Sequence, residues 1–152
     1  MTKTDGAQAA AMPVVRRARW ALAAMFFANG FLTGSWAPQI PVFLTRLEIS
    51  RFTLGLLILL FGLGAVAAMS LSGHLISRYG SRGVMRATAA CSGFGLLAVA
   101  LAPDIPLAAL AMILFGGVIG SMDVAMNANA VVVERKLGRA IMSSSHGFWS
   151  LG

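Results

Sequence analysis

The sequence predicts an all-α integral membrane protein with four transmembrane helices and the start of a fifth. Of its 152 residues, 58% are hydrophobic and only 11% are charged, whereas soluble domains carry about 25% charged residues. Asp, Glu, Lys and Arg are absent from four runs, at residues 20–45, 52–77, 87–103 and 105–122. Because about 20 helical residues cover the hydrocarbon core of a bilayer, each run is long enough to cross it.

The basic residues are concentrated on one side of these predicted crossings. Ten of the 12 Lys and Arg residues precede the first run or lie in the second and fourth connections, and only Arg46 and Arg51 lie in the first connection. The positive-inside rule therefore predicts a cytoplasmic amino terminus. The first run is about twice as long as a signal-peptide core, which argues against cleavage. The net charge of +7 does not indicate nucleic-acid binding, because the basic residues form no stripe with interleaved aromatics.

Each predicted element has its own local signal. The first helix contains Pro38 and Pro41 in WAPQIP, which should kink it or end its regular part. The second is rich in small residues, which favours close packing against more than one neighbour. The third ends at the short APDIP turn, from which the fourth returns. The last has about twelve residues, too few to span, so we expect the chain to be part of something longer. The predicted elements are a polar cytoplasmic tail at 1–19 and helices at about 20–44, 53–76, 84–102, 106–130 and 141–152.

Asp123 is the charged residue that most needs an explanation, because it follows eighteen uncharged residues. Gly116, Gly120, Asp123 and Asn127 are spaced by four, three and four residues and share one helical face. A carboxylate facing lipid would cost about 2.5 to 3.5 kcal/mol, so this face should meet the bundle interior. Removal from water disfavours the charged form of a carboxyl group, so Asp123 is a candidate proton carrier. The alternative is a protonated acid that only hydrogen-bonds a neighbouring helix.

Other polar residues are candidates for contact with a solute. Asn29, Thr33 and Trp36 share a face of the first helix, and amides, hydroxyls and indoles bind polar solutes. The alternative for these three is ordinary helix packing with an interfacial tryptophan. Asn127 and His146 are further candidates for contact with the solute. His146 can titrate near neutrality or serve as a structural hydrogen bonder. SSSHG has no orienting acid nearby, and no phosphate loop, metal-ligand cluster or dinucleotide fingerprint occurs. We therefore expect no enzyme activity, no metal and no cofactor.

The second connection, GHLISRYGSRGVMR, resembles the signature between helices two and three of the major facilitator superfamily. Gly73, Arg78, Gly80, Arg82 and Arg86 match it, whereas Ser77 stands where an acid is expected and Ser81 stands at a commonly basic position. In the superfamily this loop latches one conformation of the transporter, partly through that acid. The resemblance therefore implies a gating loop with a weaker latch.

The stretch from 120 to 152 resembles the fucose-permease-like branch of the superfamily, in particular its YbjJ-type inner-membrane members. The matching residues are Asp123, Asn127, Glu134, Arg135, His146, Gly147, Ser150 and Gly152. The resemblance implies the partial amino-terminal half of a twelve-helix transporter, completed by carboxyl-terminal helices of the same protein. Such a transporter would carry a small solute through the inner membrane by alternating access, with Asp123 coupling it to protons as in a symporter.

Two departures limit what the resemblance implies. Fucose-transporting relatives also carry an acid in helix one, which residues 20–45 lack, so sugar specificity does not transfer. The drug/proton antiporters carry an arginine in helix four, which residues 105–133 lack. The rival hypothesis from another class is a truncated or small membrane scaffold that binds partners and transports nothing.

Overall fold

The structure is a computed structural model that describes residues 3–152, with side chains from residue 12 onward. Its elements are α1 (Lys3–Gly34), the 3-10 helix η1 (Ala37–Gln39), α2 (Ile40–Leu47), α3 (Arg51–Leu101), α4 (Ile105–Leu137) and α5 (Met142–Leu151). The described residues contain helices and no strands, so the predicted all-α class is confirmed.

The first predicted helix is divided at the two prolines. The regular helix α1 ends at Gly34, η1 follows, and α2 begins at Ile40. Neither Pro38 nor Pro41 can donate a backbone hydrogen bond, which accounts for an interruption at this place. The start of α1 differs from the expectation of a tail up to residue 19, because the helix already begins at Lys3. Alanines near its start favour helix formation. The cytoplasmic location of residues 1–19 stays a prediction.

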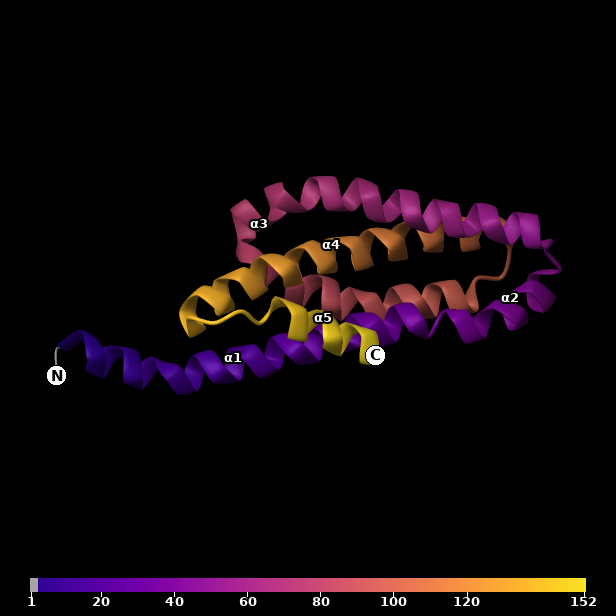
Figure 1. Cartoon of the computed structure of the whole chain (residues 1–152). Helices are drawn as coiled ribbons and strands as arrows, with labels where there is room; N and C mark the ends of the chain where they lie inside the picture. Colours follow the sequence, from indigo (N-terminus) through magenta and orange to yellow (C-terminus); the bar gives the residue numbers. More distant parts are fainter. Residues whose placement is uncertain (1–2) are drawn as a thin grey trace.

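The second and third predicted helices are two segments of α3 that fold back on each other at Gly80 (Figure 1). Gly80 has φ 74° and ψ 151°, a conformation that is essentially confined to glycine. The reversal is tighter than the predicted connection at 77–83, because helix continues up to Gly80 and resumes directly after it. Among the described residues, α3 and α4 are long and apolar enough to cross a membrane. Because α3 folds back at Gly80, it counts as two crossing segments.

Both ends of α4 have recognisable caps. The Asp104 carboxylate accepts a hydrogen bond from the backbone N–H of Leu107 at 2.9 Å, as N-cap residues do. At the other end Gly138 adopts a left-handed φ of 65°. The helix therefore runs seven residues past the predicted end at 130 and includes Glu134, Arg135 and Lys136. These residues are good helix formers, which explains why the predicted basic loop is mostly helical.

Helix α4 lies at the centre of the bundle, and its closest contact is with the first segment of α3 (Figure 1). A Cβ atom at Gly64 would overlap the backbone of Ile113, and one at Gly116 would overlap the backbone of Phe61. Glycines on both helices thus allow the two backbones to touch, as in membrane helix pairs. One buried cluster around Phe26 and Met122 fills the bundle near the start of α5, and another around Phe43 and Phe115 fills the opposite end.

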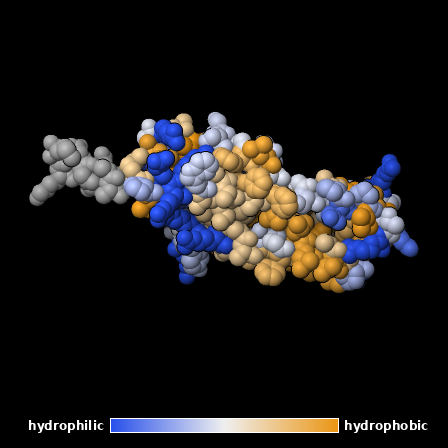
Figure 2. Space-filling model, turned by 90° about the horizontal axis from the view of Figure 1, so that it is seen from below, coloured by the Kyte–Doolittle hydropathy of each residue, from blue (hydrophilic) through white to orange (hydrophobic). Residues whose placement is uncertain are grey.

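The surface divides into two polar ends separated by an apolar belt (Figure 2). The Gly80 turn and the α4–α5 connection lie at the same end of the bundle as the start of α1, and the α2–α3 connection lies at the other end (Figure 1). Large apolar side chains, such as Phe52 and Phe94, are exposed at the surface. This is the surface expected where lipid or further helices cover the protein.

Candidate functional site

The face of α4 that carries Asp123 is polar near the middle of the bundle. The Asn127 Nδ2 group donates hydrogen bonds to the Asp123 backbone oxygen at 2.9 Å and to Asp123 Oδ1 at 3.3 Å. Both side chains are only partly buried, so one side of each stays accessible. On the same face, Gly116 and Gly120 touch the backbone of α3. The predicted face therefore exists, with its glycines used for helix packing and its polar groups left partly open.

Helix α5 brings His146 to this pair. The His146 side chain lies near Asp123, and its ring meets the Phe26 ring edge-on at 5.3 Å. His146 is exposed. A carboxyl group and an amide of α4 thus lie near an imidazole of α5. We call Asp123, Asn127 and His146 the polar cluster.

Asn29 does not share a cavity with the other two candidates of the first helix. Its side chain is 1% exposed, and its Oδ1 accepts a hydrogen bond from the Trp149 indole N–H at 2.9 Å. Asn29 Nδ2 is buried and has no hydrogen-bond partner among the described residues. The Thr33 hydroxyl donates to the Asn29 backbone oxygen at 2.9 Å. Asn29 therefore ties α1 to α5, a role that sequence spacing alone did not indicate because Trp149 is 120 positions away.

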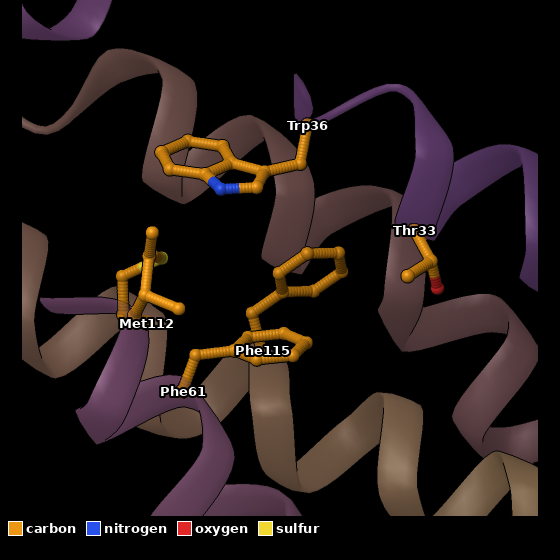
Figure 3. Close-up of a pocket in the computed structure, with 6 residues that line it drawn as sticks. Thr33, Trp36, Phe61, Met112 and Phe115 are labelled. Carbon is orange, nitrogen blue, oxygen red and sulfur yellow. The ribbon is translucent and has the colours of Figure 1, made fainter. Parts of the chain in front are cut away.

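Thr33 and Trp36 line a cavity of about 120 Å³ between α1, α3 and α4. Figure 3 shows the Trp36 indole across this cavity from the rings of Phe61 and Phe115. Those two rings are 5.5 Å apart and tilted by 55°, and Met112 closes one side (Figure 3). The lining is almost entirely apolar. Helical spacing predicted Thr33 and Trp36 but not their aromatic partners, because Phe61 and Phe115 stand in the sequence as ordinary apolar helix residues.

The gating-motif residues lie around the turn in α3. Gly80 forms the turn itself, whereas Gly73 is exposed and a Cβ there would meet nothing within 4 Å. The Arg78 guanidinium stacks over the neighbouring Tyr79 ring at 5.5 Å, and Arg82 is exposed. Ser77 stands where the superfamily signature has an acid, and its hydroxyl donates to the backbone oxygen of His74 at 2.8 Å. Ser77 thus bonds its own helix.

Glu134 has a structural role that the sequence analysis did not identify. Its Oε2 accepts hydrogen bonds from the backbone N–H groups of Ile141 at 2.8 Å and Met142 at 3.2 Å. A carboxylate in this position satisfies free N–H groups and complements the positive end of the helix dipole. Glu134 therefore fixes the start of α5 against α4, and so helps to place His146 near Asp123.

Comparison with known proteins gives consistent matches over nearly the whole chain. Residues 2–152 match the sequence profile of the Major Facilitator Superfamily. The chain is 42% identical over 131 residues to the uncharacterized transporter y4wD of Sinorhizobium fredii, covering 86% of this chain and 35% of that protein. It is 39% identical over 127 residues to an uncharacterized MFS-type transporter of Yersinia pestis, covering 84% of this chain and 33% of that protein. Over 132 residues it is 33% identical to the membrane protein MosC of Rhizobium meliloti, covering 87% of this chain and 32% of that protein.

The chain thus spans about a third of the length of the curated relatives it matches. No solved structure matches it significantly.

Proposed function

This chain belongs to the Major Facilitator Superfamily, and we propose that it acts as the amino-terminal part of a transporter that moves a small solute across a membrane by alternating access. Two relatives are named as transporters. In this proposal the protein lies in the inner membrane with its amino terminus in the cytoplasm. Further helices complete the pathway, since each relative is about three times as long as its matched region.

The polar cluster is the observation that carries a proposal of proton coupling. Asp123 is only partly buried and is held by Asn127, and His146 lies near it on α5. Ionisable groups inside a membrane bundle are costly and commonly mark ion or substrate pathways. In this mechanism Asp123 takes up a proton when its side of the pathway is open and releases it on the other side. His146 changes the charge that Asp123 experiences, and Asn127 holds the carboxyl group in either state.

The aromatic cavity indicates which part of a solute this half of the pathway would contact. Its lining of Trp36, Phe61, Phe115 and Met112 favours an apolar or aromatic group. Thr33 adds a hydroxyl at its edge. The Nδ2 group of Asn29, which has no hydrogen-bond partner among the described residues and lies one helical turn from Thr33, is a further donor for a polar solute if Trp149 moves away.

Exchange of Asp123 for asparagine in the complete protein tests the coupling. The protein is reconstituted in proteoliposomes with a trapped pH-sensitive dye, and a panel of small solutes is added while proton entry and solute exchange are recorded. We expect Asp123→Asn to abolish solute-driven proton entry and to retain solute exchange. The matched control is Asp104→Asn, which removes an acid from the opposite end of α4 and keeps a good N-cap.

Two outcomes would contradict the proposal. Solute-driven proton entry by Asp123→Asn at the wild-type rate would remove Asp123 from the mechanism. Loss of the same signal in Asp104→Asn would show that the assay responds to any loss of an acid, and the polar cluster would have no special role.

A further inference from the structure

A second, chemically different cavity lies at the basic end of the bundle. It has a volume of about 450 Å³ and lies between α1 and the segment that joins α4 to α5. Arg16, Arg19 and Arg139 line it, together with Trp20 and Ser144. No acidic residue of the described chain is part of its lining. We call it the arginine cavity, and it lies apart from the polar cluster and the aromatic cavity.

Arg19 is held in place at the edge of this cavity. Its Nη2 group donates a hydrogen bond to the Ser144 hydroxyl at 2.6 Å, and its guanidinium lies 5.6 Å from the centre of the Phe148 ring. Its other terminal nitrogen, Nη1, is buried without a hydrogen-bond partner among the described residues. A buried donor on a charged group that lacks an acceptor is costly. Arg19 therefore has an unused donor that an incoming acceptor can satisfy.

The positive charges around the cavity repel one another. Burial lowers the pKa of Arg19 below its ordinary value, and the charge of Arg139 lowers it further. The Glu134 carboxylate near the end of α4 does not line the cavity. Its Oε2 already accepts two backbone hydrogen bonds at the start of α5. An anion in the cavity would relieve this repulsion and pair with the Nη1 donor.

We propose that the arginine cavity binds a phosphoryl group, supplied by an anionic phospholipid headgroup or by a free phosphate-bearing molecule. Arginine guanidinium groups have a planar arrangement of donors that fits phosphate oxygens in pairs. Trp20 is 65% exposed beside the cavity, and its ring pairs edge-on with Phe148 at 6.1 Å. Trp residues lie preferentially at membrane interfaces, and basic pockets at the membrane surface bind lipid headgroups. The site is therefore placed where a headgroup phosphate is available.

Binding is measured on the complete protein in detergent by native mass spectrometry. The probes are dihexanoyl phosphatidylglycerol, inorganic phosphate and dihexanoylglycerol, which has the same acyl chains and no phosphoryl group. The variants are Arg139→Gln and Arg16→Gln, because neither residue hydrogen-bonds another described side chain. Arg86→Gln is the matched control, since it removes the same charge from an exposed position that does not line the cavity. Thermal unfolding checks that all three variants remain folded.

We expect wild type and Arg86→Gln to bind phosphatidylglycerol equally, and each cavity variant to bind it about tenfold more weakly. Phosphatidylglycerol binding much tighter than inorganic phosphate identifies a lipid headgroup as the source. Comparable binding of the two, both weakened by Arg139→Gln, identifies a free phosphate group. Equal binding of dihexanoylglycerol and phosphatidylglycerol, or cavity variants that bind like Arg86→Gln, would overturn the proposal. So would a wild-type protein that binds neither phosphatidylglycerol nor phosphate.

Discussion

The close contact between α3 and α4 makes a sharp prediction for Gly116→Ala. A Cβ at Gly116 would lie 2.8 Å from the carbonyl carbon of Phe61, whereas ordinary contact begins at 3.4 Å. The two helices would have to separate by about 0.6 Å for this atom alone, and the carbonyl oxygen is closer still. Overpacking of this kind costs about 1 to 3 kcal/mol. This overpacking cost equals or exceeds the gain of about 0.8 to 1.0 kcal/mol from replacing glycine with alanine in a helix.

The neighbouring glycine is the matched control, because it undergoes the same chemical change in the same helix. A Cβ at Gly117 would lie 3.5 Å from Ala68 Cβ, which is ordinary contact. Gly117→Ala should therefore be neutral or stabilising, and Gly116→Ala should be less stable than it by about 1 to 3 kcal/mol. The free energy of unfolding is measured by titrating mixed micelles with denaturing detergent and recording circular dichroism. A Gly116→Ala protein as stable as Gly117→Ala would refute the backbone contact between α3 and α4.

Three further predictions concern the turn and the helix ends. Glu134→Ala should speed hydrogen exchange at the first amides of α5 by roughly two- to thirtyfold, because a lost cap costs about 0.5 to 2 kcal/mol. Unchanged exchange would mean that the carboxylate does not hold α5. Gly80→Ala should destabilise the protein by about 1 to 3 kcal/mol, because alanine does not readily adopt the backbone conformation of Gly80. The control in thermal unfolding is Gly83→Ala, where a Cβ makes ordinary contact. Equal destabilisation of the two variants would contradict the prediction. Trp149→Phe should lower the free energy of unfolding by about 1 to 3 kcal/mol, because it leaves the buried Asn29 oxygen unpaired. Adding Asn29→Leu should recover part of that loss. Purely additive losses in the double variant would exclude the hydrogen bond.

Much of the fold was predictable because bilayer-spanning sequences are dominated by apolar run length. The all-α class followed from the uncharged runs, and the break near Pro38 followed from backbone chemistry. Helix ends were less predictable: residues 131–136 are charged or β-branched, yet they continue α4 up to the cap at Gly138. The start of α1 at Lys3 is a second helix end that lies outside the predicted bounds. A segment of polar and small residues can be either helical or an irregular tail, and composition alone does not distinguish the two.

The candidate site was predictable only within single helices. Four-residue spacing placed Asp123 and Asn127 together, and the structure has them hydrogen-bonded. The same reasoning grouped Asn29 with Trp36, yet Asn29 turns to α5 while Trp36 faces the cavity. Thr33 belongs to the same unbroken helix as Asn29 and still lines the cavity, so the separation of Asn29 comes from the position of α5 beside it. Contacts between helices, such as that of Asn29 with Trp149, depend on packing that no spacing rule contains.

Helix α5 is held by polar contacts at both of its ends, and this has a consequence for how the proposed transporter would work. Glu134 of α4 holds its start, and the Asn29–Trp149 hydrogen bond holds its far end against α1. His146 lies between these two points. A movement of α1 that broke the Asn29–Trp149 bond would leave the buried Asn29 oxygen unpaired, so it would be opposed unless a solute satisfied that oxygen. The same movement would change the distance between His146 and Asp123. Solute binding near Asn29 and the charge experienced by Asp123 would then be linked through one short helix, which is the physical requirement for coupling.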